Sequence, residues 1–142
     1  MQRDFILREI ERMGAIMNAI RQKIFGGKEN TAITLGTQIE NAKNMLLNET
    51  SFDLDNFLDL DIESSNNYIC SFEGFSIENI ELLAECISQI GFNDKCEHSK
   101  RYLEKALQLY ELCNFKSKTY SFERETNIET IKNAMQENNY ND

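Results

Sequence analysis

Apolar residues recur along the first 25 positions with the spacing of one face of an α-helix. Six of them alternate between steps of four and three, namely Ile6, Ile10, Met13, Met17, Ile20 and Ile24. At about 100° per residue these side chains fall close to one line, which predicts a helix over residues 4–25. Phe5, Leu7, Ile16 and Phe25 widen this stripe beyond a two-stranded coiled-coil seam, so we expect it to pack in a globular core.

The rest of the chain also favours helices. It contains no proline and only six glycines, which argues against a turn-rich β-sandwich and for helices joined by short polar loops. Further helices are predicted over residues 31–48 and 121–136, and a helical hairpin over residues 76–113, with Ser76 as the first N-cap and Gly91 as the stop of its first helix. The predicted fold class is all-α, with five to six antiparallel helices in a single domain of residues 1–136 and a disordered tail at 137–142.

Residues 51–75 are interpreted as an acidic, aromatic connection that is irregular apart from one or two helical turns in DNFLDLD. This segment contains five aromatic residues: Phe52, Phe57, Tyr68, Phe72 and Phe75. Because aromatic rings have so much apolar surface to bury, we expect the connection to fold back on the core.

Charge is strongly segregated along the chain. Residues 44–94 contain eleven acidic residues and no Lys or Arg, whereas residues 1–43 carry seven basic and five acidic residues and residues 95–142 carry eight of each. The formal net charge of −9 therefore belongs to the middle. One interpretation is a solvated surface that aids solubility, and the other is a face for a basic partner. Nucleic acid is not expected as a partner, because phosphate binding needs clustered Lys and Arg.

Three glutamates, Glu78, Glu81 and Glu85, follow one side of the first hairpin helix at spacings of three and four. Like charges at this spacing repel by roughly a few tenths of a kcal/mol per neighbouring pair, and the segment supplies no cation to relieve them. We therefore predict that these three residues bind protein, through electrostatic complementarity to a basic or amphipathic peptide.

Neither catalysis nor metal binding is predicted. His98 is the sole histidine, and the chain has no nucleophile elbow, phosphate loop or HExxH motif, so we expect a non-enzymatic protein without cofactors. Cys86, Cys96, His98 and Cys113 lack the close-pair spacing of zinc ligands, and DLDNFLDLDIE lacks the glycine and final glutamate of a calcium loop in register. All four cysteines, Cys70 included, are interpreted as reduced thiols in the core.

The first residues indicate a cytoplasmic location. Charges interrupt the apolar positions of MQRDFILREIERMG, unlike the apolar region of a secretory signal, and no run approaches the roughly 20 apolar residues of a spanning helix. The basic residues of this helix raise the alternative that it lies on an anionic membrane surface. Asp4, Glu9 and Glu11 dilute that charge, so a membrane surface is not expected as a partner.

The segment LLAECISQIGFNDKCEHSKRYLEKALQLYELC resembles a tetratricopeptide (TPR) helical hairpin, in which Ala106 of the YLEKAL phrase allows close helix approach. Its turn is about three residues longer than in the usual repeat, the closing proline is missing and no second copy follows at a period of about 34 residues. Together with RDFILREIERMGAIMNAI and the LDLD phrase of Leu58–Asp61, this hairpin resembles an uncharacterised bacterial family of short, TPR-like helical proteins. The resemblance implies an all-helical intracellular protein with a role in protein interaction, and it carries over no catalytic residues.

Two functions remain open from the sequence. The first is a protein-interaction module that binds a basic or amphipathic peptide or protein through the acidic helical face of Glu78, Glu81 and Glu85. The alternative is a structural homo-oligomer that buries the apolar stripe of helix 4–25 between subunits.

Overall fold

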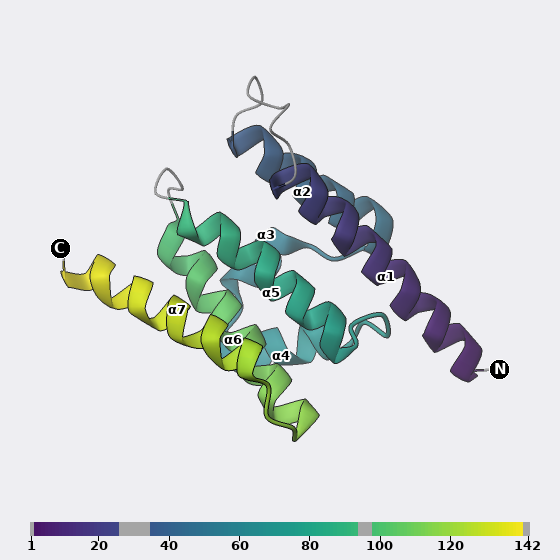
Figure 1. Cartoon of the computed structure of the whole chain (residues 1–142). Helices are drawn as coiled ribbons and strands as arrows, with labels where there is room; N and C mark the ends of the chain where they lie inside the picture. Colours follow the sequence, from purple (N-terminus) through teal and green to yellow (C-terminus); the bar gives the residue numbers. More distant parts are fainter. Residues whose placement is uncertain (1, 26–34, 94–97, 141–142) are drawn as a thin grey trace. The chain divides into compact units, whose positions relative to one another are not determined.

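The computed structural model describes residues 2–25, 35–93 and 98–140, and these residues form seven α-helices and no strand. The predicted all-α class is confirmed, with at least one helix more than the predicted five to six. The helices are α1 Gln2–Phe25, α2 Leu35–Thr50, α3 Leu54–Asp59, α4 Ile62–Cys70, α5 Ile77–Phe92, α6 Ser99–Ser117 and α7 Phe122–Tyr140 (Figure 1).

The chain consists of two compact units, residues 1–82 and 83–142, with the boundary inside α5. The single domain of residues 1–136, expected from the length of the chain, stays a prediction. Each unit is described by itself below.

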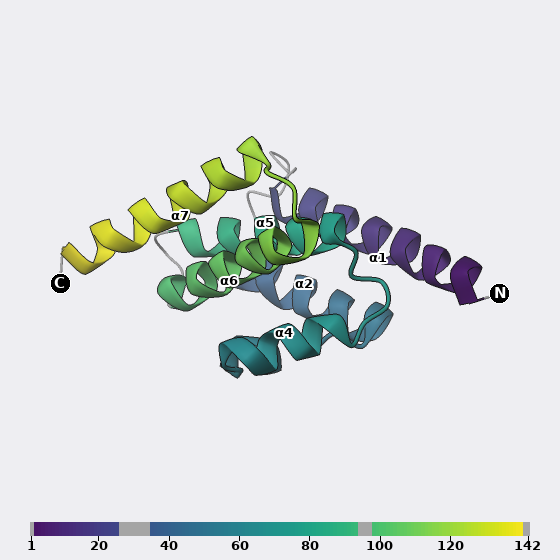
Figure 2. The ribbon, with the colours of Figure 1, turned by 90° about the horizontal axis from the view of Figure 1, so that it is seen from below.

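In the first unit, α1 and α2 run antiparallel and pack side by side (Figures 1 and 2). Their buried residues are Met13, Ile16, Met17 and Ile20 of α1 and Ile39, Ala42 and Leu46 of α2. The predicted stripe is therefore right for the second half of α1. Its beginning is not buried, since Phe5, Ile6 and Leu7 are 49 %, 38 % and 50 % exposed. The predicted start of α2 at residue 31 lies outside the described residues.

Two short helices, α3 and α4, occupy most of the 51–75 connection. The one or two helical turns predicted in DNFLDLD correspond to α3, whereas the irregular conformation predicted for the rest was wrong at Ile62–Cys70, which form α4. Each begins at an aspartate N-cap. The Asp53 carboxylate accepts a hydrogen bond from the Asn56 N–H at 3.1 Å, and the Asp61 carboxylate accepts one from the Ser64 N–H at 2.8 Å. These caps satisfy amide donors that a helix of one or two turns otherwise leaves unpaired, which lets such short helices form in a packed chain.

The five aromatic residues of this connection pack together, as expected. Phe52 is fully buried at the centre, and its ring centroid lies 5.3–5.5 Å from those of Phe57, Tyr68, Phe72 and Phe75. The Tyr68 hydroxyl also accepts a hydrogen bond from the Asp53 N–H at 2.9 Å. The aromatic cluster therefore ties both ends of the connection to one another, with edge and tilted ring contacts that aromatic pairs favour.

In the second unit, α5 and α6 approach closely at Gly91. The predicted helix stop at this glycine was wrong, because Gly91 is buried inside α5, which continues to Phe92, and its φ is not positive. A Cβ atom at this position would lie 2.8 Å from the Leu103 side chain and 3.1 Å from its backbone nitrogen. The glycine is thus needed for close packing rather than for a turn. Ala106, predicted to serve the same purpose, is fully buried.

The remaining boundaries differ by a few residues from those predicted. The expected start of α6 near Asp94 lies outside the described residues, and the helix ends at Ser117 rather than Cys113. Ser121 caps α7, since its hydroxyl accepts a hydrogen bond from the Arg124 N–H at 3.2 Å. This helix buries Ile128 and Ile131 and reaches Tyr140, so the predicted tail at 137–142 is helical as far as the chain is described.

The cysteines divide between core and surface. Cys86 and Cys113 are buried free thiols, as expected for small core residues. Cys70 is a free thiol but is exposed at the end of α4, so the prediction that it lies in the core was wrong. Cys96 lies outside the described residues.

Candidate functional site

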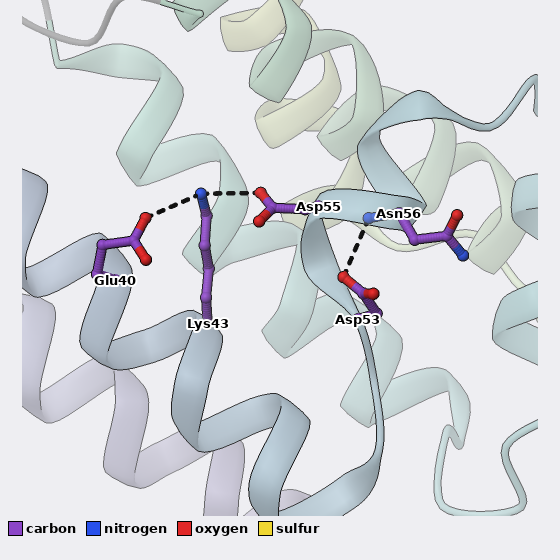
Figure 3. A network of polar contacts seen from close by, with 5 residues as sticks. All are labelled: Glu40, Lys43, Asp53, Asp55 and Asn56. Carbon is purple, nitrogen blue, oxygen red and sulfur yellow. Dashed lines mark hydrogen bonds and ion pairs between the residues drawn. The ribbon is translucent and has the colours of Figure 1, made fainter.

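Several carboxylates of the acidic stretch, residues 44–94, form local hydrogen bonds or ion pairs. Besides the two aspartate caps, Asp55 forms an ion pair with Lys43, whose Nζ lies 2.8 Å from Asp55 Oδ1 and 3.4 Å from Glu40 Oε1 (Figure 3). Figure 3 shows this bridge from α2 to α3 beside the Asp53 cap. Lys43 is the last cation before the acidic stretch, so part of that stretch folds against the basic residue that precedes it.

Two sets of residues carry side chains of the types that ligate metal ions. The carboxylates of Asp53 and Asp61 accept hydrogen bonds from backbone amides at the helix starts. Cys86 and Cys113 are buried, His98 is exposed, and Cys96 lies outside the described residues. Across residues 2–25, 35–93 and 98–140, no three His, Cys, Asp or Glu side chains come together in a way that would hold a metal ion.

The three candidate glutamates lie along one face of α5, as their spacing predicts. They differ in surroundings, because Glu78 is exposed whereas Glu81 and Glu85 are half-buried. Glu85 lines a pocket in the second unit to which Glu78 and Glu81 do not contribute. The structure therefore divides the predicted set and assigns only Glu85 to this pocket.

This pocket has a volume of about 220 Å³ and is lined by residues of α5, α6 and α7. Its lining residues are Glu85, Ser88, Gln89 and Phe92 of α5, Tyr110 of α6, and Glu123, Asn127, Thr130 and Ile131 of α7. Sites for small-molecule ligands usually measure about 300–1,000 Å³. The α5–α7 pocket is smaller and matches one side chain of a partner better than a cofactor.

The lining combines negative charge with polar and apolar side chains. Glu85 and Glu123 supply carboxylates, and no Lys, Arg or His is among the described residues that line the pocket. Ile131 and Tyr110 are nearly fully buried, while Phe92 is 39 % exposed. Side chains that pair an aliphatic stem with a cationic end suit such a lining, because stem and charge each meet a compatible surface.

Glu123 was missed from the sequence. It stands 38 positions after Glu85, and only the packing of α7 against α5 and α6 places both carboxylates in one pocket. Its position in the first turn of α7 gives no distinguishing signal, since acidic residues are common there for their interaction with the helix dipole.

No helix within the described ranges combines the length and the apolar character needed to cross a membrane. No family model, curated protein or solved structure matches the chain. The pocket is therefore interpreted from its own residues and geometry.

Proposed function

We propose that this chain is a non-enzymatic protein-interaction module that takes a lysine or arginine side chain of a partner into the α5–α7 pocket. Glu85 and Glu123 pair with the cationic group, and Phe92 contacts the aliphatic stem. The hydroxyl and amide groups of the rim hold the partner backbone or bridging water. The observation that carries the proposal is the presence of two carboxylates from different helices in one small pocket.

The direct test is an NMR titration of the ¹⁵N-labelled chain with N-acetyl-lysine amide. A ligand of this size binds with a Kd of about 1 mM or weaker, by the usual binding energy of roughly 0.3 kcal/mol per heavy atom. We expect shifts of the Glu85, Gln89 and Asn127 amides. N-acetyl-norleucine amide, which has the same apolar stem without the charge, should bind at least about fivefold more weakly.

Matched substitutions separate the pocket from the rest of α5. Glu85→Gln and Glu123→Gln keep the shape and remove the charge, so each should weaken binding of the lysine amide and lower its salt sensitivity. Glu78→Gln removes the same charge from the same helix outside the pocket, and its titration should match that of the natural chain. Equal binding of the norleucine amide, or shifts that avoid the pocket, would show that the proposal is wrong.

A pull-down identifies the natural partner once the pocket is established. The tagged chain and its Glu85→Gln, Glu123→Gln double variant are compared after low-salt and then high-salt washes, with mass spectrometry as the readout. A relevant partner is retained by the natural chain at low salt, lost at high salt and absent from the double variant. A partner that persists in both would depend on apolar contacts elsewhere.

The homo-oligomer stays as a second candidate because of one observation, the exposed apolar start of α1. Phe5, Ile6 and Leu7 lie outside the core of their own unit, and a second copy is an economical way to cover them. Light scattering of the natural chain and of Leu7→Glu tests this. The homo-oligomer requires a dimer or larger species that Leu7→Glu dissociates. Leu47→Glu, which changes an exposed leucine of α2, is the control and should leave that species intact.

A further inference from the structure

The turn between α6 and α7 exposes three aromatic side chains within eight residues. Phe115 is 80 % exposed, Tyr120 75 % and Phe122 77 %, and these are the largest values among the exposed large hydrophobic residues of the described chain. In Figure 1 the turn lies where the green ribbon of α6 gives way to the yellow-green of α7. We call residues 115–122 the aromatic tip.

The exposed aromatic area is large for so short a segment. At 150–250 Å² per buried aromatic side chain, three rings at these exposures present roughly 450 Å² in total. Exposed apolar patches of about 300–600 Å² are the largest that single chains usually carry, and they commonly mark interaction sites. The aromatic tip therefore reaches the size at which an exposed apolar patch commonly marks an interaction site.

Hydrogen bonds hold the tip in shape. Arg124 is buried at 5 % exposure, and its Nη1 donates to Asn114 Oδ1 at 2.9 Å and to Ser117 Oγ at 3.1 Å. The Thr119 hydroxyl donates to the Ser117 carbonyl at 2.8 Å, and Lys118 closes α6 in the left-handed conformation with φ 57°. The rings are thus presented from a fixed turn, so a partner does not have to order it on binding.

The tip is cationic in a chain of net charge −9. No acidic residue occurs between 112 and 122, and Lys116 and Lys118 are both exposed. Three aromatic rings and two ammonium groups thus occur within the same eight residues. The headgroup region of a bilayer accepts both at the same depth, because aromatic rings partition there and anionic lipids attract lysine.

We propose that the aromatic tip docks the protein on an anionic lipid membrane, with Phe115, Tyr120 and Phe122 entering the headgroup region and the two lysines facing lipid phosphates. This inference is independent of the α5–α7 pocket and extends beyond the proposed function. From the sequence, a membrane surface was an alternative only for helix 4–25, where acidic residues interrupt the basic ones. Binding is expected to be reversible, since a few rings and two charges form a weak anchor.

Vesicle flotation tests the docking. Phosphatidylcholine vesicles with a phosphatidylglycerol fraction should carry the natural chain at low salt, and vesicles of phosphatidylcholine alone should carry much less. Each lysine near an anionic surface accounts for about a fivefold change in partitioning, so Lys116→Gln with Lys118→Gln should weaken binding by roughly 25-fold. Phe115→Ser should weaken it by about tenfold or more, from lost apolar burial. Ile62→Ser, which removes an exposed apolar residue of the other unit, should have no effect.

Tryptophan fluorescence can locate the contact, because the chain contains no tryptophan and a single introduced indole is then the only one that emits. A Tyr120→Trp substitution places a single indole in the tip, and its emission should shift to shorter wavelength when anionic vesicles are added. The emission of an Ile62→Trp control should stay unchanged. Circular dichroism confirms that each variant is folded.

Three outcomes would overturn the membrane proposal. They are failure of the natural chain to float with anionic vesicles at low salt, equal losses for Phe115→Ser and Ile62→Ser, and an unshifted indole in a Tyr120→Trp chain that does float. A shift that depends on protein concentration without vesicles would replace the membrane with a second copy of the chain as the occupant of the tip.

Discussion

Asn79 connects three segments of the first unit through a single buried amide. The side chain is 4 % exposed, and its Nδ2 donates to the Ile10 carbonyl of α1 at 2.9 Å and to the Gly74 carbonyl at 2.8 Å. Gly74 lies tightly against α1, since a Cβ on it would sit 2.8 Å from the Glu9 carbonyl oxygen. We therefore predict that Asn79→Asp, although nearly isosteric, destabilises the protein more than Asn79→Ala does.

The magnitudes follow from what each substitution leaves behind. Asn79→Ala removes two hydrogen bonds, but the Gly74 carbonyl keeps the Ser76 N–H at 3.1 Å, and the Ile10 carbonyl lies inside α1, where helix geometry gives it a donor. At about 1 kcal/mol per net hydrogen bond and a small cavity, the cost is about 2–3 kcal/mol. Asn79→Asp instead turns a carboxylate toward two carbonyl oxygens, and an uncompensated buried charge costs about 3–5 kcal/mol.

Urea denaturation followed by circular dichroism measures both costs at neutral pH. In thermal denaturation, the midpoint temperature should fall by roughly 3–4 °C for each kcal/mol of lost stability in a chain of this size. Asn18→Asp places the same new charge on an exposed position of α1 and should leave the midpoint almost unchanged. If Asn79→Asp proved as stable as Asn79→Ala, or more stable, the side chain would act through its volume rather than as a hydrogen-bond donor.

Further substitutions test the packing and the acidic stretch. Gly91→Ala should cost about 1–3 kcal/mol in urea denaturation, because its Cβ meets Leu103, whereas Gly36→Ala, exposed in the first turn of α2, should be neutral or slightly stabilising; equal effects would contradict close packing at Gly91. Asp61→Ala should lower the free energy of unfolding by about 1 kcal/mol through loss of the α4 cap, while Glu63→Ala two positions later should change it little. Asp55→Asn should lower the free energy of unfolding by less than about 1 kcal/mol, since an ion pair with a 70 % exposed carboxylate is well solvated. A loss of stability that is larger at high salt than at low salt would argue against an ion-pair contribution.

Local patterns were sufficient for most helices. The 3.6-residue period of α1, α2, α5 and α6 and the serine caps of α5 and α7 are properties of neighbouring residues, so they can be read without the fold. Residues 51–75 could not be read in this way. Their helices are one to three turns long, too short for a period to emerge, and their stability comes from the aspartate caps and the ring cluster around Phe52.

The candidate sites show a sharper division. The glutamate face of α5 follows from spacing alone, but which glutamate enters a pocket depends on the carboxylate that α7 supplies across from it. The exposure of Phe115 and Phe122 could not be predicted either, because an aromatic residue in a helical pattern is expected in the core. Their exposure is decided by where the α6–α7 turn places them.

The sequence by itself determined the all-helical class, the faces that most helices bury and the segregation of negative charge, because periodicity and charge order are local properties of the chain. Tertiary structure alone decided the close approach at Gly91, the pairing of Glu85 with Glu123 in one pocket and the exposure of the aromatic tip. These features join residues far apart in sequence or depend on which neighbours are absent, and no local pattern encodes either.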